Sequence, residues 1–199
     1  MVFRLIISGE HACFPREEVQ DALVTHDIIT PIAALGLIES IHWKPAIRWH
    51  ILRIHILEPV RRVKVPGPWP TLALLRPRWA VDIDFELTTR AGPADSFRAH
   101  EEMFRKKARR LPEKHCYLGL MRFPASIMLI SAEEPLNPAP GSDKDLDLGW
   151  IPFRRLDRNP ARFGYFHACA RGGVLHLPTC TEGRSLLAPD PGISEVLPV

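Results

Sequence analysis

The sequence has few of the features that mark a secreted, membrane-spanning or zinc-binding protein. No apolar run approaches the ~20 residues of a membrane span. Residues 2–8 are too short and too soon polar for a signal peptide, so we expect them to form a first strand. The four cysteines stand far apart and no C-x-x-C pair occurs. This spacing favours reduced, buried thiols and argues against a zinc site. We therefore expect a cytoplasmic protein with no membrane contact and no metal or other cofactor.

A strong excess of charge is also absent, because the net charge is only +3. The basic residues are nevertheless unevenly spread. Residues 48–78 hold seven Lys or Arg against one acid, and residues 98–114 hold seven against three. Two explanations stay open at this point, a polyanionic partner or a pair of solvated faces.

Several motifs of known nucleic-acid binders and hydrolases are missing. The strand expected at 79–87 has no K/R-G-F-G-F pattern, which argues against base stacking on the face of a sheet. No nucleophile elbow or activated-cysteine motif occurs. His50 and His55 have no acidic or cysteine partner at metal-ligand spacing, so a metal site is not expected.

What the sequence does contain is a regular order of elements. Thr30 followed by Pro31 is typical of a helix start, and Pro45 cannot continue a helix. The expected elements are a strand at 2–8, a helix at 31–43, strands at 46–57 and 79–87, a helix at 94–110 and a strand at 122–131. This order predicts an α+β protein with a ferredoxin-like (RRM-like) βαββαβ domain over residues 1–135.

The C-terminal part is expected to be a separate small unit. Short strands at 148–156, 163–169 and 173–178 predict a small antiparallel β-sheet within residues 145–180, and residues 181–199 are expected to be an irregular tail.

The strand at 46–57 alternates apolar and basic residues, with one slip at Ile51 and Leu52. A β-bulge at the slip would keep its four basic side chains on one face, namely Arg48, His50, Arg53 and His55. That face could meet a polyanion or could pair with the acidic face of 79–87. The Pro-rich stretch 58–78 is expected to be a connection rather than an element.

Two places gather the groups that metal-free RNA cleavage needs. Histidine can move protons near neutral pH, and lysine or arginine can stabilise the charge that forms on phosphorus. His42 stands two residues before Lys44, and His100 two residues after Arg98. A helix-end histidine that packs on Trp43 is the competing explanation of His42, and His100 could be an ordinary helix residue.

A longer sequence pattern helps to decide whether His42 and His100 are catalytic or structural residues. The run Asp27 to Trp49, which ends in H-W-K-P-A-I-R-W, is similar to the type I-C (Dvulg) subtype of the CRISPR-associated Cas-five family in the RAMP superfamily. The segment R-I-H-I-L-E-P at 53–59 fits the same family, as do collinear motifs over roughly residues 1–175, among them A-G-P-A-D at 91–95 and R-F-P-A at 122–125.

The resemblance implies the same fold and a specific activity. A member of this family cuts the repeat of precursor CRISPR RNA without metal, through attack of a 2′-hydroxyl. It then stays on the 5′ handle as a Cascade subunit, beside the backbone and large subunits of that complex. The family's site joins a residue at the end of the first helix to a Lys-His pair that opens the second helix. In this sequence those positions are His42 and Ala99-His100.

The match therefore points to His42, His100 and Arg98 as catalytic candidates. The RNA-binding candidates are Trp43, Lys44, Arg16, Arg48, Arg53 and Arg122. Ala99 stands where the family has lysine, and Arg98 would have to supply the charge although adjacent helical positions point about 100° apart. Residues 60–78 are short where the family usually carries a long insertion, which indicates a compact variant. A non-catalytic subunit that caps the 5′ handle is the alternative, which Ala99 favours, whereas the retained His42 and His100 favour the nuclease.

Overall fold

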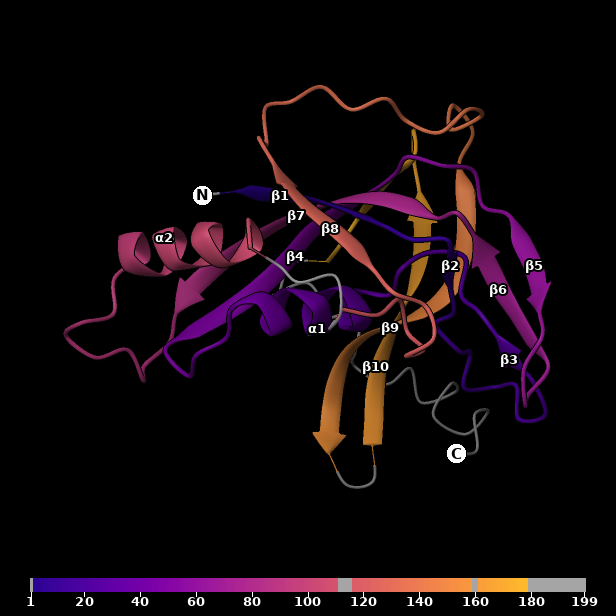
Figure 1. Cartoon of the computed structure of the whole chain (residues 1–199), viewed down its shortest axis with the longest axis horizontal. Helices are drawn as coiled ribbons and strands as arrows, with labels where there is room; N and C mark the ends of the chain where they lie inside the picture. The colour runs from indigo at the N-terminus through magenta and orange to yellow at the C-terminus, as the bar shows by residue number, and fades with distance from the viewer. Residues whose placement is uncertain (1, 111–115, 159–160, 179–199) are drawn as a thin grey trace.

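The computed structural model describes residues 2–110, 116–158 and 161–178. A five-stranded sheet in the order β11-β4-β7-β1-β8 forms its centre (Figure 1). Its strands are β1 (Phe3–Ser8), β4 (Ile47–Ile56), β7 (Arg78–Leu87), β8 (Ser126–Ile130) and β11 (Val174–His176). All neighbours in this sheet are antiparallel. Strands β1, β4, β7 and β8 with helices α1 and α2 give the predicted ferredoxin-like arrangement, which is thereby confirmed.

Helix α1 (Pro31–Ile41) begins where the sequence predicts. The hydroxyl of Thr30 accepts a hydrogen bond from the backbone N–H of Ala33 at 3.3 Å, and Pro31 occupies the first turn, where its missing N–H costs nothing. The helix ends two residues earlier than expected, because His42 is already extended with φ −153°.

Helix α2 (Phe97–Ala108) is capped in the same way by Ser96, whose hydroxyl accepts from the N–H of Ala99 at 3.2 Å. Phe97 and Met103 are exposed, whereas His100, Phe104 and Ala108 are buried. Phe104 packs on Phe3 and Trp49 of the sheet, with ring centroids 5.1 and 4.7 Å apart. Because α2 is rotated so that Phe104 faces the sheet, His100, which lies one turn before it, is buried on the same side of the helix.

The predicted β-bulge is present, because the register of β4 against β7 shifts between Ile51 and Arg53. The basic face of β4 meets the acidic face of β7. Two ion pairs show this, Arg48 with Glu86 at 2.8 Å and Arg53 with Asp82 at 2.9 Å. Pairing between the strands is thus the observed explanation of both charged faces.

Two expectations about strands are wrong. Residues 58–78 are more than a connection, since they contain β5 (Arg62–Val65) and β6 (Thr71–Leu75). Strand β6 also pairs with β2 (His11–Ala12) and β3 (Leu23–Val24), which forms a second sheet. The third C-terminal strand, β11, joins the central sheet beside β4 instead of the small sheet.

The small antiparallel sheet itself is confirmed, as a ribbon of β9 (Leu146–Arg158) and β10 (Ala161–Ala170) that runs past α1 (Figure 1). The tail expected at 181–199 lies outside the described residues. Where the chain is described, none of its helices has the length and apolar character to span a membrane.

Three cysteines lie in the described ranges and each is a free thiol; Cys13 and Cys116 are buried as expected, whereas Cys169 is half-buried. Burial raises the pKa of Cys13 to about 11. This thiol is therefore neutral and unreactive at physiological pH.

Candidate active site

The two histidines singled out in the sequence lie in contact. His42 caps the C-terminus of α1 and His100 lies in the first turn of α2, and His42 Nε2 is 3.1 Å from His100 Nδ1. Both residues are buried, with exposed fractions of 1% and 3%. The indole N–H of Trp49 donates to the carbonyl of His42 at 2.7 Å, which fixes the end of α1 over the sheet. The fold therefore brings together residues 58 positions apart.

Two further charged residues extend this pair on either side. His100 Nε2 lies 2.9 Å from Asp95 Oδ1, and the other oxygen of that carboxylate accepts from the N–H of Gly92 at 2.9 Å. On the opposite side Lys107 Nζ lies 3.3 Å from His42 Nδ1. The result is a continuous chain in the order Lys107, His42, His100, Asp95.

The chemistry of its two ends sets the direction of this chain. An ammonium can only donate and a carboxylate can only accept. Lys107 therefore donates to His42 Nδ1, His42 Nε2–H donates to His100 Nδ1, and His100 Nε2–H donates to Asp95. Every polar atom has a partner in this arrangement when both imidazoles are neutral.

The electrostatic surroundings agree with a neutral His42. Burial lowers the pKa of His42 to about 4, and the positive charge of Lys107 acts in the same direction. At the other end the hydrogen bond from the backbone of Gly92 lowers the pKa of Asp95 most, and His100 adds to it. At neutral pH the site therefore holds a neutral His42 imidazole beside the ammonium of Lys107.

Trp43 and Lys44 lie at the edge of this cluster. Trp43 is 57% exposed, and the His42 ring lies against His100 with centroids 5.4 Å apart. The ring of His42 thus packs on His100. Lys44 is exposed, and its positive charge contributes to the lowered pKa of both His42 and Asp95.

Arg98 is not part of the cluster. Its side chain is 88% exposed and donates to Glu102 at 2.9 Å, one turn along the outer face of α2. The catalytic role of Arg98 stays a prediction that the geometry does not support.

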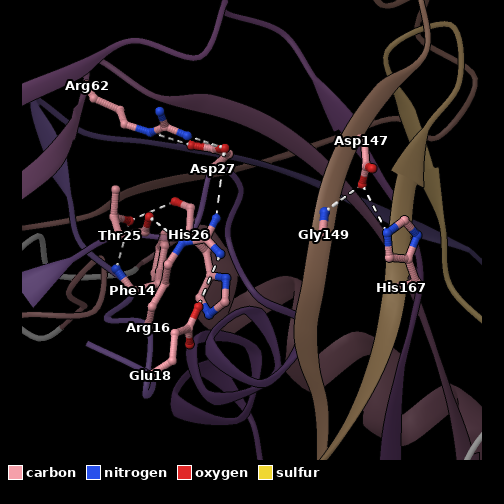
Figure 2. A network of polar contacts seen from close by, with 10 residues as sticks. All are labelled: Phe14, Arg16, Glu18, Thr25, His26, Asp27, Arg62, Asp147, Gly149 and His167. Atoms are coloured by element: carbon pink, nitrogen blue, oxygen red, sulfur yellow. Dashed lines mark hydrogen bonds and ion pairs between the residues drawn. The ribbon is translucent and has the colours of Figure 1, made fainter. Parts of the chain in front are cut away.

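The other four RNA-binding candidates lie away from the histidine pair. Arg48 and Arg53 are held by Glu86 and Asp82 on β7. Figure 2 shows Arg16 between the carbonyl of Thr25 and the carboxylates of Glu18 and Asp27.

Arg122 donates to the carbonyl of Pro66 and to the hydroxyl of Thr71, at 3.1 and 2.6 Å. It thereby ties the segment before β8 to the hairpin of β5 and β6. RNA contacts by these arginines remain predictions.

Sequence reasoning missed Asp95 and Lys107. Asp95 is part of the A-G-P-A-D match, but nothing in the sequence points to its contact with His100. Lys107 is one of several cations in a basic run.

No group of three or more His, Cys, Asp or Glu side chains able to hold a metal ion occurs in the described part of the chain.

Comparisons with known proteins identify the family of this chain and agree with its fold. The family model described as CRISPR-associated protein (Cas_Cas5) matches residues 2–174. A curated relative from Mannheimia succiniciproducens, named CRISPR pre-crRNA endoribonuclease Cas5d, is 28% identical over 214 residues, which cover 88% of this chain and 94% of the relative. A relative of the same name from Thermus thermophilus is 29% identical over 210 residues, with 85% and 88% covered.

Solved structures show the same fold. A crystal structure of a CRISPR-associated protein superposes with a TM-score of 0.81 at 16% identity, and covers 92% of this chain and 94% of its own. A functionally uncharacterized protein from Streptococcus mutans gives 0.78 at 17% identity, with the same coverage. Because the family model spans most of the sequence, the chain belongs to the Cas5 family of CRISPR-associated proteins, in its type I-C (Cas5d) branch.

Proposed function

We propose that this protein is a metal-independent endoribonuclease that cuts the repeat of precursor CRISPR RNA. The observation that carries the proposal is the hydrogen-bonded chain from Lys107 through His42 and His100 to Asp95. The two curated relatives, which bear this activity in their names, support it.

In this mechanism His42 is the general base. The scissile phosphate draws the ammonium of Lys107 onto its own oxygens and so uncovers the lone pair of His42 Nδ1. His42 Nδ1 then takes the proton of the 2′-hydroxyl as its oxygen attacks phosphorus. The 5′-oxygen leaves with a proton from solvent, and the products carry a 2′,3′-cyclic phosphate and a 5′-hydroxyl.

The other members of the chain support these steps. His100 accepts the hydrogen bond from His42 Nε2–H, and Asp95 orients His100 and helps to stabilise the positive charge that forms on His42, as a carboxylate does for the imidazole of a catalytic triad. Lys107 and the exposed Lys44 stabilise charge on the phosphate, a contribution that is typically large in such sites. This arrangement supplies a cation although Ala99 replaces the family's lysine.

After cleavage we propose that the protein stays on the 5′ handle of the CRISPR RNA, inside a Cascade complex with its backbone and large subunits, in the cytoplasm. A purely binding role on the same handle is the competing function. The burial of His42 and the alanine at position 99 favour that alternative.

Cleavage of a repeat stem-loop RNA in excess EDTA tests the proposal. We expect the wild type to cut, and His42→Ala to slow cleavage ~10²-fold or more with unchanged RNA affinity, because a general base is lost. Tight, salt-sensitive binding without cleavage would establish the purely binding role instead. An unchanged rate in His42→Ala would refute the assignment of the base.

A further inference from the structure

Two large aromatic side chains are exposed beside the histidine pair and take no part in the proposed chemistry. Trp43 directly follows His42 in the chain and is 57% exposed. Phe97 lies one turn before His100 on α2 and is 56% exposed. Single exposed apolar residues are ordinary, but two large rings beside one site indicate a surface that another molecule covers.

The two rings come from adjoining segments of the chain. The α1–β4 turn, which contains Trp43, and the β7–α2 loop, which leads to Phe97, lie side by side at one end of the molecule (Figure 1). Thr88 joins these segments, since its N–H donates to the carbonyl of Ala46 at 2.9 Å and its hydroxyl to the carbonyl of Pro45 at 2.7 Å. Trp43 and Phe97 together therefore form an aromatic rim beside the histidine pair.

The local structure keeps each ring of the aromatic rim accessible. His42 is extended, with φ −153° and ψ 112°, so its side chain and that of Trp43 point to opposite sides of the chain. His42 thus enters the buried pair while Trp43 turns to solvent. The ring of Phe97 packs on Phe85 with centroids 5.5 Å apart, and more than half of its surface stays open. Open aromatic rings of this kind suit a planar ligand that stacks on them.

The charges around the aromatic rim favour RNA over a protein as the molecule that covers it. Two exposed lysines act on His42, namely Lys107 at 3.3 Å from its Nδ1 and Lys44 through its charge. The carboxylate of Asp95 is engaged by His100 at 2.9 Å. Aromatic rings beside cations are the combination by which proteins hold single-stranded nucleic acid, through base stacking and phosphate contacts. The centre of a protein–protein interface is instead depleted of charge.

The spacing of the rings suits neighbouring nucleotides. Phe97 and His100 are three residues apart on a helix, so their side chains are neighbours with Cβ atoms about 5–6 Å apart. Trp43 is the residue next to His42 in the chain. A phosphate that reaches His42 Nδ1 therefore brings its two adjoining nucleotides toward the aromatic rim.

We propose that Trp43 and Phe97 stack the nucleobases of the two nucleotides that flank the scissile phosphate. This inference rests on the proposed function, because it takes the repeat RNA as ligand and the phosphate at His42 as its reference point. Bases that are splayed apart and stacked on aromatic side chains are a common mode of RNA recognition. The aromatic rim thus selects which phosphate reaches His42 and takes no part in the proton transfers.

A scan with abasic nucleotides tests the aromatic rim. Repeat stem-loop RNAs that lack one base at a time are titrated against full-length proteins that all carry His42→Ala, so that the RNA stays intact. Trp43→Leu and Phe97→Leu each remove one ring and keep an apolar side chain. Trp150→Leu is the matched control, because Trp150 is also an exposed aromatic residue, at 52%, but lies on the β9–β10 ribbon.

We expect the control to show two adjacent positions, on either side of the phosphate that the wild type cuts, at which base removal weakens binding by about 5- to 150-fold, the range for base–aromatic stacking. Each rim variant should bind intact RNA more weakly by a similar factor. It should show no further loss at one of the two positions, a different one for each ring. Trp43→Phe should restore the effect at its position, because a smaller ring still stacks.

Thermal melting establishes that each variant is folded. The proposal is overturned if the control has no sensitive position, or if either folded rim variant keeps the full positional profile of the control. RNA binding of control strength by both rim variants would overturn it in favour of a protein partner at the aromatic rim.

Cleavage is measured separately on the same substitutions with His42 restored. The rim variants should cut at neighbouring phosphates as well, since the register of the RNA is no longer fixed. A positional profile without any cleavage would remove the nuclease and leave base stacking on the aromatic rim. Cleavage in EDTA with a flat profile would remove the stacking and leave the nuclease.

Discussion

At the scale of single residues, Lys107 affects His42 in two ways. Its ammonium occupies the lone pair of His42 Nδ1, and its charge opposes protonation of the ring, which adds to the effect of burial on the pKa of His42. A substrate phosphate competes for the same ammonium. In the proposed mechanism the base therefore stays neutral and covered until the phosphate is in place.

Lys107→Ala should lower kcat by about 10- to 10³-fold, because a cation beside the reacting phosphate is lost. It should also raise the pKa of His42, since one of the charges that lower it is gone. The base must be neutral to act, so the acid limb of the pH–rate profile should move to higher pH. Rates measured from pH 4 to 8 check both effects.

Lys106→Ala is the matched control for this prediction. Lys106 is the adjacent exposed lysine on α2 and carries the same charge. Loss of general electrostatic attraction for RNA would affect both variants equally. Equal rates and equal acid limbs in the two variants would contradict a specific role for Lys107.

The sequence pointed to His42 and His100 but not to their charged partners, and the reason is geometric. Lys107 lies in the run 105–110, and only the rotation of α2 on the sheet decides which cation faces α1. Asp95 precedes the N-cap of α2, so its approach to His100 depends on the conformation of the turn at Gly92 rather than on helical spacing. Periodicity cannot supply either fact.

At the scale of elements, strands β4 and β7 are joined by ion pairs of unequal burial. Asp82 is 0% exposed and accepts from Arg4, Arg53 and His55, whereas Glu86 pairs with Arg48 in solvent. Burial alone would raise the pKa of Asp82, but the hydrogen bonds from His55 and Arg4 hold it well below its ordinary value. One carboxylate therefore neutralises charge from both neighbouring strands.

Asp82→Asn should destabilise the protein by about 3–5 kcal/mol, because the nearly buried Arg4 loses its counter-charge. Glu86→Gln, on the same face of the same strand, should cost less than about 1 kcal/mol, since the pair is exposed. Urea unfolding at pH 7 measures both values. Similar losses in the two variants would show that burial of the pair does not matter.

The elements themselves were predicted unevenly. Helix α1 was predicted from its N-cap, strands β4 and β7 were predicted from long alternation, and the slip at Ile51–Leu52 correctly indicated the bulge. Strands β5 and β6 were missed because they are short and flanked by proline. Strand β11 was assigned to the wrong sheet, because three residues contain no information about which edge they join.

At the scale of the whole molecule, α1 has a buried histidine close to each end. Burial lowers the pKa of both His26 and His42 to about 4, against 6.5 as the ordinary value. Between these values the unfolded chain takes up a proton at each histidine and the folded chain does not. Stability from this source is therefore fully present above pH 6.5 and is lost as the pH falls toward 4.

We expect the free energy of unfolding to fall between pH 7 and pH 4.5 by an amount on the order of 1–3 kcal/mol for each histidine. The depressed pKa of Asp82 does not contribute in this range, because its effect begins only below its ordinary value of 3.8. His26→Leu should reduce the slope by about half and leave the share of His42. Urea titrations at several pH values measure these slopes, and a wild-type slope retained in His26→Leu would contradict the burial of a neutral His26 imidazole in the folded chain.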